Sequence, residues 1–140
     1  MEQRLTIITL GVSNIDVAAD FYENKLGWKR QGNSMGDIVF FQLNGIQLAL
    51  YPVKELAKDA TVPANGEGFK GFTLAQNVRS EKEVDELIST LKSKGVKVVK
   101  EPEKAFWGCY SSYIQDPEGN LWEIAYNPHL KLDAAGSVIG

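Results

Sequence analysis

The chain contains few of the side chains that most often bind metals or form covalent links. Its 140 residues include one cysteine, Cys109, and one histidine, His129. A single cysteine cannot form a disulfide within the chain, and this usage is typical of reducing compartments, so we expect a cytoplasmic protein. A single histidine argues against a histidine-rich metal site within one chain.

Long apolar runs and clustered positive charge are also missing. The first mostly apolar stretch, residues 5–12, is too short to span a bilayer, and no small-residue cleavage site follows it. The 15 basic and 18 acidic residues give a net charge of −3, and the basic residues are scattered rather than aligned in a stripe. We therefore expect neither a membrane nor a nucleic acid as a partner.

The apolar pattern of the first half changes from strand-like to helical and back. Ser13, with Asp16 three residues later, resembles the start of a helix, and Gly27 stands where a helix ends. Asn44-Gly45, between two β-like runs, is a strong hairpin signal. The expected elements are a strand at 5–12, a helix at about 15–26, a weak strand at 28–32, and strands at 37–43 and 46–51.

The second half repeats this order after a segment without a clear period. Residues 54–68 are typical of a linker, with a helical turn expected at 53–59. Ser80 and Glu83 form a capping-box pattern ahead of an apolar helical stripe, which Gly95 ends. The other expected elements are strands at 69–77, 96–100, 110–115 and 121–126, and a turn at 116–120.

This repeat predicts an α+β fold of two paired βαβββ modules within a single domain. We place module one at about 4–53, a linker at 54–68, module two at about 69–128 and a C-terminal tail at 129–140. The helix of each module covers one sheet face only, so pairing the modules would curve the bare faces into a shared cup. The alternative is one mixed sheet in which the repeat is coincidental.

Several motifs follow one another in an order found in a known superfamily. They are Thr9-Leu10-Gly11-Val12, Phe21-Tyr22-Glu23-Asn24-Lys25-Leu26-Gly27-Trp28, Phe106-Trp107-Gly108-Cys109-Tyr110-Ser111-Ser112-Tyr113 and Asp116-Pro117-Glu118-Gly119-Asn120-Leu121-Trp122-Glu123. Together they resemble the vicinal oxygen chelate superfamily, which covers glyoxalase I, extradiol dioxygenases, and bleomycin- and fosfomycin-resistance proteins. The resemblance spans nearly all of residues 5–128 and implies the paired-module fold and a homodimer. It implies much less about activity, because this fold supports many activities.

The resemblance also implies where a divalent metal would bind, with one ligand from each of four strands. The four positions fall at Ile7, at Gln47, at Phe72 (or Gly71 or Thr73 if the register slips), and at Glu123. Glu123 is a good ligand and Gln47 a weak one, whereas isoleucine and phenylalanine cannot coordinate a metal. Catalytic transition-metal sites usually have three protein ligands, so we expect no metal and no other cofactor. The alternative is a divalent metal at a non-standard site.

Strand alternation sorts the side chains of the return strands between the cup and the helices. If Glu123 and Gln47 face the cup, the residues that alternate with them along their own strands face the helices. These alternating residues are apolar in both modules, which supports this register. Ile7 and Phe72 would line the same cup. Glu123 would then act as a general base, bind a cationic or hydroxyl-bearing ligand, or only hydrogen-bond a neighbour. Gln47 would orient a ligand or hydrogen-bond Glu123.

Aromatic residues near the last hairpin are further candidates for ligand contacts. Trp107, Tyr110 and Tyr113 would form a wall that stacks on a planar or cationic ligand, or else pack at a module or dimer interface. Cys109 lies among them, but nothing places His129 nearby to activate it. We therefore expect a buried, inert thiol.

The sequence therefore predicts a glyoxalase/bleomycin-resistance-like protein that binds a small apolar or aromatic molecule in the cup without a metal. The alternative is an enzyme of the same superfamily, a lyase, an isomerase or a dioxygenase, that uses Glu123 as its base or a non-standard metal site. A third class is an interaction module without a small-molecule ligand.

Overall fold

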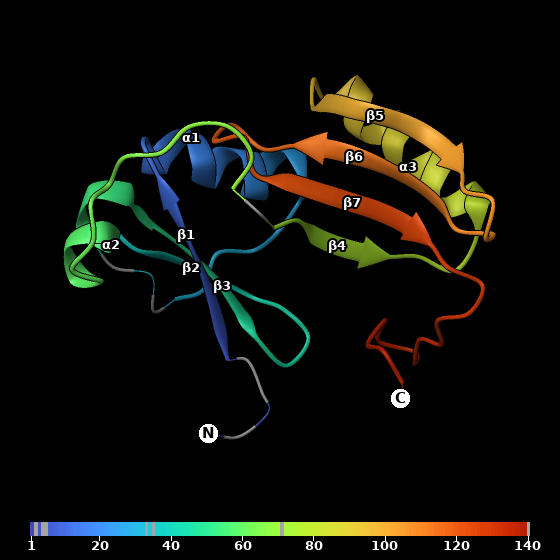
Figure 1. Ribbon diagram of the computed structural model, residues 1–140, viewed down its shortest axis with the longest axis horizontal. Coiled ribbons are helices and arrows are strands. Elements are labelled where there is room, and N and C mark those ends of the chain that lie inside the picture. Colours follow the sequence, from blue (N-terminus) through green and yellow to red (C-terminus); the bar gives the residue numbers. More distant parts are fainter. Residues whose placement is uncertain (2, 4–5, 33, 35, 71, 140) are drawn as a thin grey trace. The chain divides into compact units, whose positions relative to one another are not determined.

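The computed structural model describes residues 1, 3, 6–32, 34, 36–70 and 72–139. The chain forms two compact units, unit 1 within residues 1–68 and unit 2 within residues 69–140 (Figure 1). Each unit contains a β-sheet and at least one helix, so the expected α+β class is confirmed. Leu5 and Gly71, which the sequence places in a strand and at a candidate ligand position, lie outside the described residues. No helix within the described ranges is long and apolar enough to cross a membrane.

The sheet of unit 1 has three strands in the order β1-β3-β2. Strand β3 (Gln47–Pro52) pairs in parallel with β1 (Ile7–Val12) and antiparallel with β2 (Val39–Gln42). The weak strand expected at 28–32 is reduced to a single bridge between Arg30 and Phe41. Close after this bridge, the Ser34 N–H donates to the Gln31 carbonyl oxygen at 3.1 Å.

Helix α1 (Ile15–Asp20) continues without a break into a π-helical turn, η1 (Phe21–Lys25). The expected cap at Ser13 is wrong by one residue. Asn14 is the N-cap, because its side-chain oxygen accepts a 3.0 Å hydrogen bond from the Val17 N–H. Asparagine and serine are comparably good N-cap residues, so composition alone could not decide between Ser13 and Asn14.

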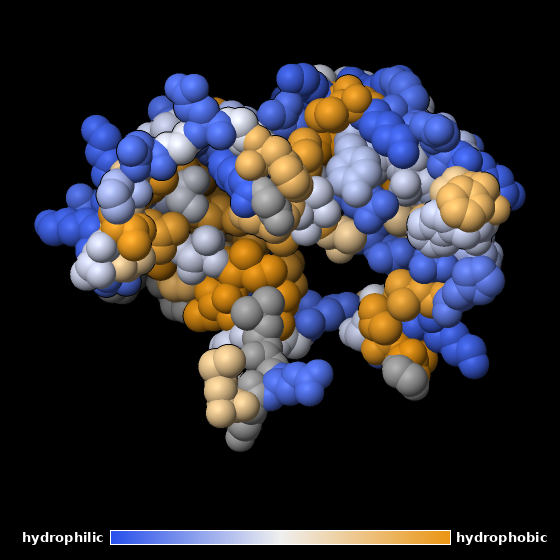
Figure 2. Space-filling view, viewed as in Figure 1, coloured by the Kyte–Doolittle hydropathy of each residue, from blue (hydrophilic) through white to orange (hydrophobic). Residues whose placement is uncertain are grey.

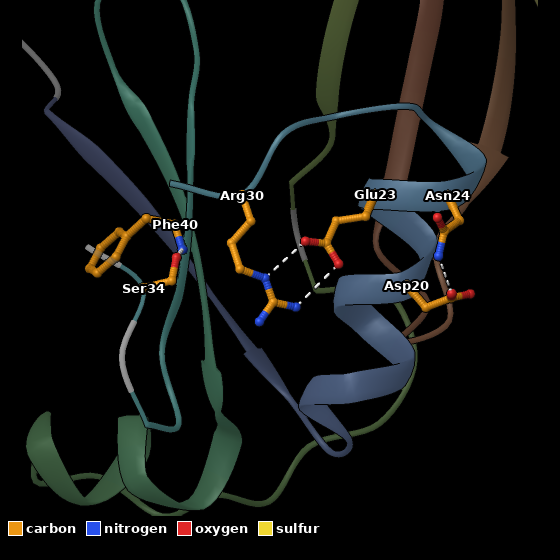
Figure 3. A network of polar contacts seen from close by, with 6 residues as sticks. All are labelled: Asp20, Glu23, Asn24, Arg30, Ser34 and Phe40. Carbon is orange, nitrogen blue, oxygen red and sulfur yellow. Dashed lines mark hydrogen bonds and ion pairs between the residues drawn. The ribbon is translucent and has the colours of Figure 1, made fainter. Parts of the chain in front are cut away.

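Figure 3 shows the polar contacts that tie η1 to the segment after it. Arg30 Nε and Nη2 donate to the two carboxylate oxygens of Glu23 at 2.9 and 3.2 Å. Gly27 lies between them with φ of +74°, a conformation that lets the chain reverse and that glycine adopts without strain. The pair is solvent-exposed, so it contributes only about 0.3–1 kcal/mol to stability.

An aromatic cluster forms the core of unit 1 between η1 and the sheet. The ring centroid of Tyr22 lies 5.3 Å from that of Trp28 and 5.6 Å from that of Phe41. Leu48 and Leu50 of β3 are fully buried, and their register with β2 places them on the same face of the sheet as Phe41. One face of this sheet therefore packs against α1 and η1.

Helix α2 (Val53–Asp59) follows β3 directly and confirms the helical turn expected there. It lies close to β1 at one point. A Cβ atom at Gly11 would lie 3.0 Å from Val53 Cγ2 and 3.2 Å from Val53 Cα, so a glycine is needed for this approach. Residues 61–70, which follow, are exposed.

The sheet of unit 2 has four strands in the order β4-β7-β6-β5. Strand β7 (Leu121–Tyr126) pairs in parallel with β4 (Leu74–Asn77) and antiparallel with β6 (Tyr110–Gln115), which pairs antiparallel with β5 (Lys97–Lys104). Strands β6 and β7 have the expected bounds. Strand β4 begins later than expected and β5 extends further, with two register shifts along its length.

Helix α3 (Glu81–Ser93) has the expected signals at both ends. Ser80 Oγ accepts a 3.1 Å hydrogen bond from the Glu83 N–H, and Glu83 Oε2 accepts one of 2.9 Å from the Arg79 N–H. This confirms the capping box. Gly95, with φ of +78°, follows the helix. The predicted apolar stripe consists of Val84, Leu87, Ile88 and Leu91; three of these are buried, and Leu87 is partly buried.

The turn between β6 and β7 is organised by the buried carboxylate of Asp116. Its Oδ1 accepts from the N–H groups of Glu118 (2.9 Å) and Asn120 (2.8 Å), and its Oδ2 accepts from Asn120 Nδ2 (2.8 Å). Lys70 Nζ donates to Asn120 Oδ1 at 3.1 Å. The polar groups of this turn hydrogen-bond one another, so the Asp-Pro-Glu-Gly-Asn motif has a structural role.

The tail ends in a small hairpin held by one arginine. Arg79 Nη2 donates to the carbonyl oxygens of Asp133 (2.7 Å) and Ala134 (3.2 Å). Val138 and Ile139 at its end are exposed, and Figure 2 shows apolar side chains at the surface of this hairpin.

The strand order of the two units confirms the internal repeat. In unit 1 the order β1-β3-β2 is followed by the bridge at Arg30, and in unit 2 the order is β4-β7-β6-β5. In both units the first strand is parallel to the last, and a helix follows the first strand.

Candidate functional site

The two faces of the unit 2 sheet differ in what covers them. Helix α3 contacts β5, β6 and β7, and the sheet residues buried with it are Ile114, Trp122 and Ile124. The side chains that alternate with these residues point to the other face. We call this other face the site face and define it by Lys100, Ser111, Tyr113 and Glu123.

One row of residues crosses all four strands on the site face. Tyr113 on β6 pairs with both Lys100 on β5 and Glu123 on β7, and Glu123 pairs with Ala75 on β4. Paired residues of neighbouring strands share a face, with Cβ atoms about 4.5–5.5 Å apart in antiparallel pairs. A lysine, a tyrosine and a glutamate therefore stand side by side in that order.

Glu123 is partly buried and has a carboxylate that is not used within unit 2. Among the described residues of the chain, no group donates a hydrogen bond to this carboxylate or forms an ion pair with it. The Tyr113 hydroxyl likewise makes no hydrogen bond with any described residue. Two adjacent polar groups on this sheet face thus have no hydrogen-bond partner among the described residues.

Cys109 lies at the same side of the sheet, just before β6. It is 6% exposed, and burial raises the pKa of its thiol, as does the negative charge of Glu123, while the positive charge of Lys100 lowers it. The net effect keeps the thiol protonated at neutral pH, so it is a poor nucleophile. The two charged side chains of the row both act on this one buried atom.

Tyr110 points to the face opposite the site face. Its hydroxyl donates a 2.7 Å hydrogen bond to Asp85 Oδ1 of α3, which raises the pKa of Tyr110 together with partial burial. Tyr110 and Tyr113 therefore do not stand in one aromatic wall. A second contact beside it, from Lys104 Nζ to Glu81 Oε1 at 2.7 Å, raises the pKa of Lys104.

Trp107 lies in the tight turn that joins β5 to β6. The Ala105 N–H donates to the Cys109 carbonyl oxygen at 2.8 Å, which closes the turn, and Gly108 has φ of +97°. Trp107 is 51% exposed, and Phe106 beside it is fully exposed. The structure thus places Trp107 at a hairpin tip, apart from the row of Tyr113 and Glu123.

The candidates in unit 1 lie on neighbouring strands of its own sheet. Ile7 of β1 pairs with Gln47 of β3, on the face opposite the buried Leu48, as expected from the alternation. Ile7 is 41% exposed. Gln47 Nε2 donates to Gln42 Oε1 at 3.2 Å, so part of its amide is already used inside unit 1.

The residues at the four expected metal-ligand positions do not fit a transition metal. Ile7 and Phe72 have no lone pair to donate, and an amide oxygen such as that of Gln47 is a weak ligand. Phe72 precedes β4 and is 43% exposed. Within the part of the chain that the structure describes, no three His, Cys, Asp or Glu side chains gather into a group that could hold a metal ion.

Lys100 is the site-face residue that the sequence reasoning missed. Its strand was expected to end there, and two register shifts along β5 break the simple alternation of side chains. Counting every second residue therefore fails on this strand. Lys100 can instead be placed through its partner, because it pairs with Tyr113 on the regular strand β6, whose two faces are easy to assign.

This fold, with a helix over one face of each sheet, is similar to those of several solved structures. A glyoxalase-related enzyme from Fulvimarina pelagi is 34% identical over 99% of each chain, with a TM-score of 0.86. A lactoylglutathione lyase from Agrobacterium tumefaciens is 26% identical over 91% of this chain and 96% of its own, with a TM-score of 0.70. A glyoxalase/bleomycin resistance protein/dioxygenase from Nocardioides has the same fold, with 23% identity, coverage of 100% of this chain and 91% of its own, and a TM-score of 0.78.

Comparison of the sequence with family models indicates the same superfamily as comparison of the fold with solved structures. Residues 4–124 match the Glyoxalase/Bleomycin resistance protein/Dioxygenase superfamily, and the chain belongs to this superfamily. No curated protein matches the chain.

Proposed function

We propose that this protein binds a small organic molecule with an apolar or aromatic body at the site face, without a metal. The observation that carries the proposal is the carboxylate of Glu123, which is partly buried and has no hydrogen-bond or ion-pair partner among the described residues. A partly desolvated carboxylate is stabilised when a donor group reaches it. A ligand with an O–H or N–H group would supply that donor, and the ring of Tyr113 would contact its apolar body.

The chemistry of the donor set supports binding without a metal. Of the four positions where the superfamily would hold a metal, two carry hydrocarbon side chains, Ile7 and Phe72. Glu123 and Gln47 alone would leave such an ion short of the usual three protein ligands.

A second candidate is an enzyme that uses Glu123 as a general base. It is favoured by the likeness to a glyoxalase-related enzyme and to a lactoylglutathione lyase. A carboxylate without a partner can accept a proton from a bound substrate as readily as a hydrogen bond. The enzyme and the binding protein therefore use the same residue and differ in whether the ligand is converted.

A thermal-shift screen with planar and apolar compounds, run in the presence of a chelator, tests the proposal. We expect the melting temperature of the wild-type protein to rise with a subset of compounds, and this rise to shrink for Glu123→Gln. Glu55→Gln, the same change at an exposed residue of α2, is the control and should behave as wild type. Stabilisation that needs an added divalent ion, or that is equal in Glu123→Gln, would contradict the proposal.

Analysis of the compound after incubation separates the two candidates. A binding protein returns the ligand unchanged. Turnover that is lost in Glu123→Gln while ligand affinity is retained would identify the enzyme.

A further inference from the structure

The row across the site face carries opposite charges at two of its positions. Lys100 stands on β5 and Glu123 on β7, and the strand between them presents Tyr113. Because neighbouring strands are about 4.8 Å apart, the backbones of Lys100 and Glu123 are about 10 Å apart. Tyr113 lies between them along the row.

The contacts of the two charged groups agree with this separation. Lys100 Nζ has Glu103 Oε2 at 3.7 Å on its own strand, a long contact between exposed side chains that is worth little in water. No ion pair joins Lys100 to Glu123 among the described residues. The row therefore presents a cation, an aromatic ring and an anion in sequence.

The charges of Lys100 and Glu123 nevertheless both influence the pKa of the same group, the thiol of Cys109. The buried thiol of Cys109 is influenced by Glu123 in one direction and by Lys100 in the other. Both charged residues therefore lie near this thiol, on either side of Tyr113 along the row. A molecule lying along the row would reach both.

We propose that the ligand of the site face is a zwitterionic aromatic compound, with an anionic group held by Lys100 and a cationic donor held by Glu123. This inference rests on the proposed function and adds the charge pattern of the ligand. The aromatic body lies against Tyr113, whose ring separates the two charges. Ligands with one charge only would leave either the lysine or the glutamate unused.

A matched set of para-substituted benzenes tests the charge pattern. The set contains aminoalkyl-benzoates with one to three methylenes, their methyl esters, which are cations, and alkyl-benzoates of the same length, which are anions. Dissociation constants are measured by titration calorimetry. We expect the best zwitterion to bind about tenfold or more tightly than its ester and its alkyl analogue, as one charge-assisted contact is lost in each.

The variants assign each end of the ligand. Lys100→Gln should remove the advantage of the zwitterion over the ester and leave the ester unchanged, and Glu123→Gln should remove its advantage over the alkyl-benzoate. Lys97→Gln, on the same strand and paired with Gln115, is the control and should change neither. The inference would be overturned if the zwitterion and its ester bound equally tightly to the wild type. It would also be overturned if Lys100→Gln weakened the binding of zwitterions, esters and alkyl-benzoates by the same factor.

The outcome also separates this inference from the proposed function. If compounds of the thermal-shift screen bind at Glu123 but none of the three sets does, the charge pattern is wrong and the proposed function stands. If nothing binds in either experiment, both are wrong.

Discussion

Tyr113 and Glu123 lie directly opposite each other on β6 and β7, on the face of the sheet that α3 does not cover. Neither the hydroxyl nor the carboxylate is used by another described residue. On the opposite face the polar groups are used, as in the hydrogen bond from Tyr110 to Asp85. The difference between the two faces is the basis for placing ligand binding on one and structural support on the other.

Tyr110→Phe should destabilise the protein in a pH-dependent way. Loss of an exposed hydrogen bond to a carboxylate costs about 0.5–1 kcal/mol. The hydrogen bond to Asp85 raises the pKa of Tyr110, so the folded state holds this proton more tightly than the unfolded state, where the pKa is about 10. The contribution is therefore complete below pH about 10 and is lost as the pH rises through the raised pKa of the folded state.

Urea unfolding of Tyr110→Phe and wild type at pH 8 and at pH 11 measures this effect. We expect a lower free energy of unfolding for the variant at pH 8 and a smaller difference at pH 11. Tyr113→Phe, whose hydroxyl has no partner among the described residues, serves as the control and should cost less at pH 8. If both variants lowered the free energy of unfolding equally at pH 8 and at pH 11, the contact with Asp85 would contribute nothing to stability.

Asp116→Asn should destabilise unit 2 by about 2–3 kcal/mol, because it removes the charge and one acceptor from a buried hydrogen-bonded turn. An amide nitrogen would face either Asn120 Nδ2 or the two backbone N–H groups that the carboxylate now accepts. Asp37→Asn, at an exposed position, is the matched control and should change the free energy of unfolding little. A loss no larger than that of the control would mean that the turn forms without the carboxylate.

Gly11→Ala should destabilise unit 1 by about 1–3 kcal/mol, because the added methyl group has no room beside Val53. Gly66→Ala adds the same methyl group where nothing lies within 4 Å and should be neutral. Thermal unfolding of both variants compares them. If Gly11→Ala melts at the wild-type temperature, α2 does not pack against β1 as closely as described.

Local sequence signals predicted most of the fold. The bounds of β6 and β7 follow from regular alternation between well-marked turns, and the ends of α3 follow from Ser80, Glu83 and Gly95. Prediction failed where two neighbouring residues are equally good caps, as at Ser13 and Asn14. It also failed where the alternation was interrupted, as in β5.

The candidate site was predicted less completely than the fold. Glu123 could be placed because its strand is regular, and the alternation of β3 correctly separated Gln47 from Leu48. Tyr110 was grouped with Tyr113 although the two are three positions apart, which puts them on opposite faces of a strand. The homodimer and the cytoplasmic location stay predictions.

The central claim is that Glu123 binds an organic ligand without a metal. It is tested most directly by calorimetric titration of the most stabilising screened compound, in buffer containing a chelator, into wild type and Glu123→Gln. The account predicts saturable binding to the wild type and an affinity at least about tenfold lower for Glu123→Gln. Binding that disappears with the chelator and returns with a divalent ion, or that is the same in both proteins, would contradict it.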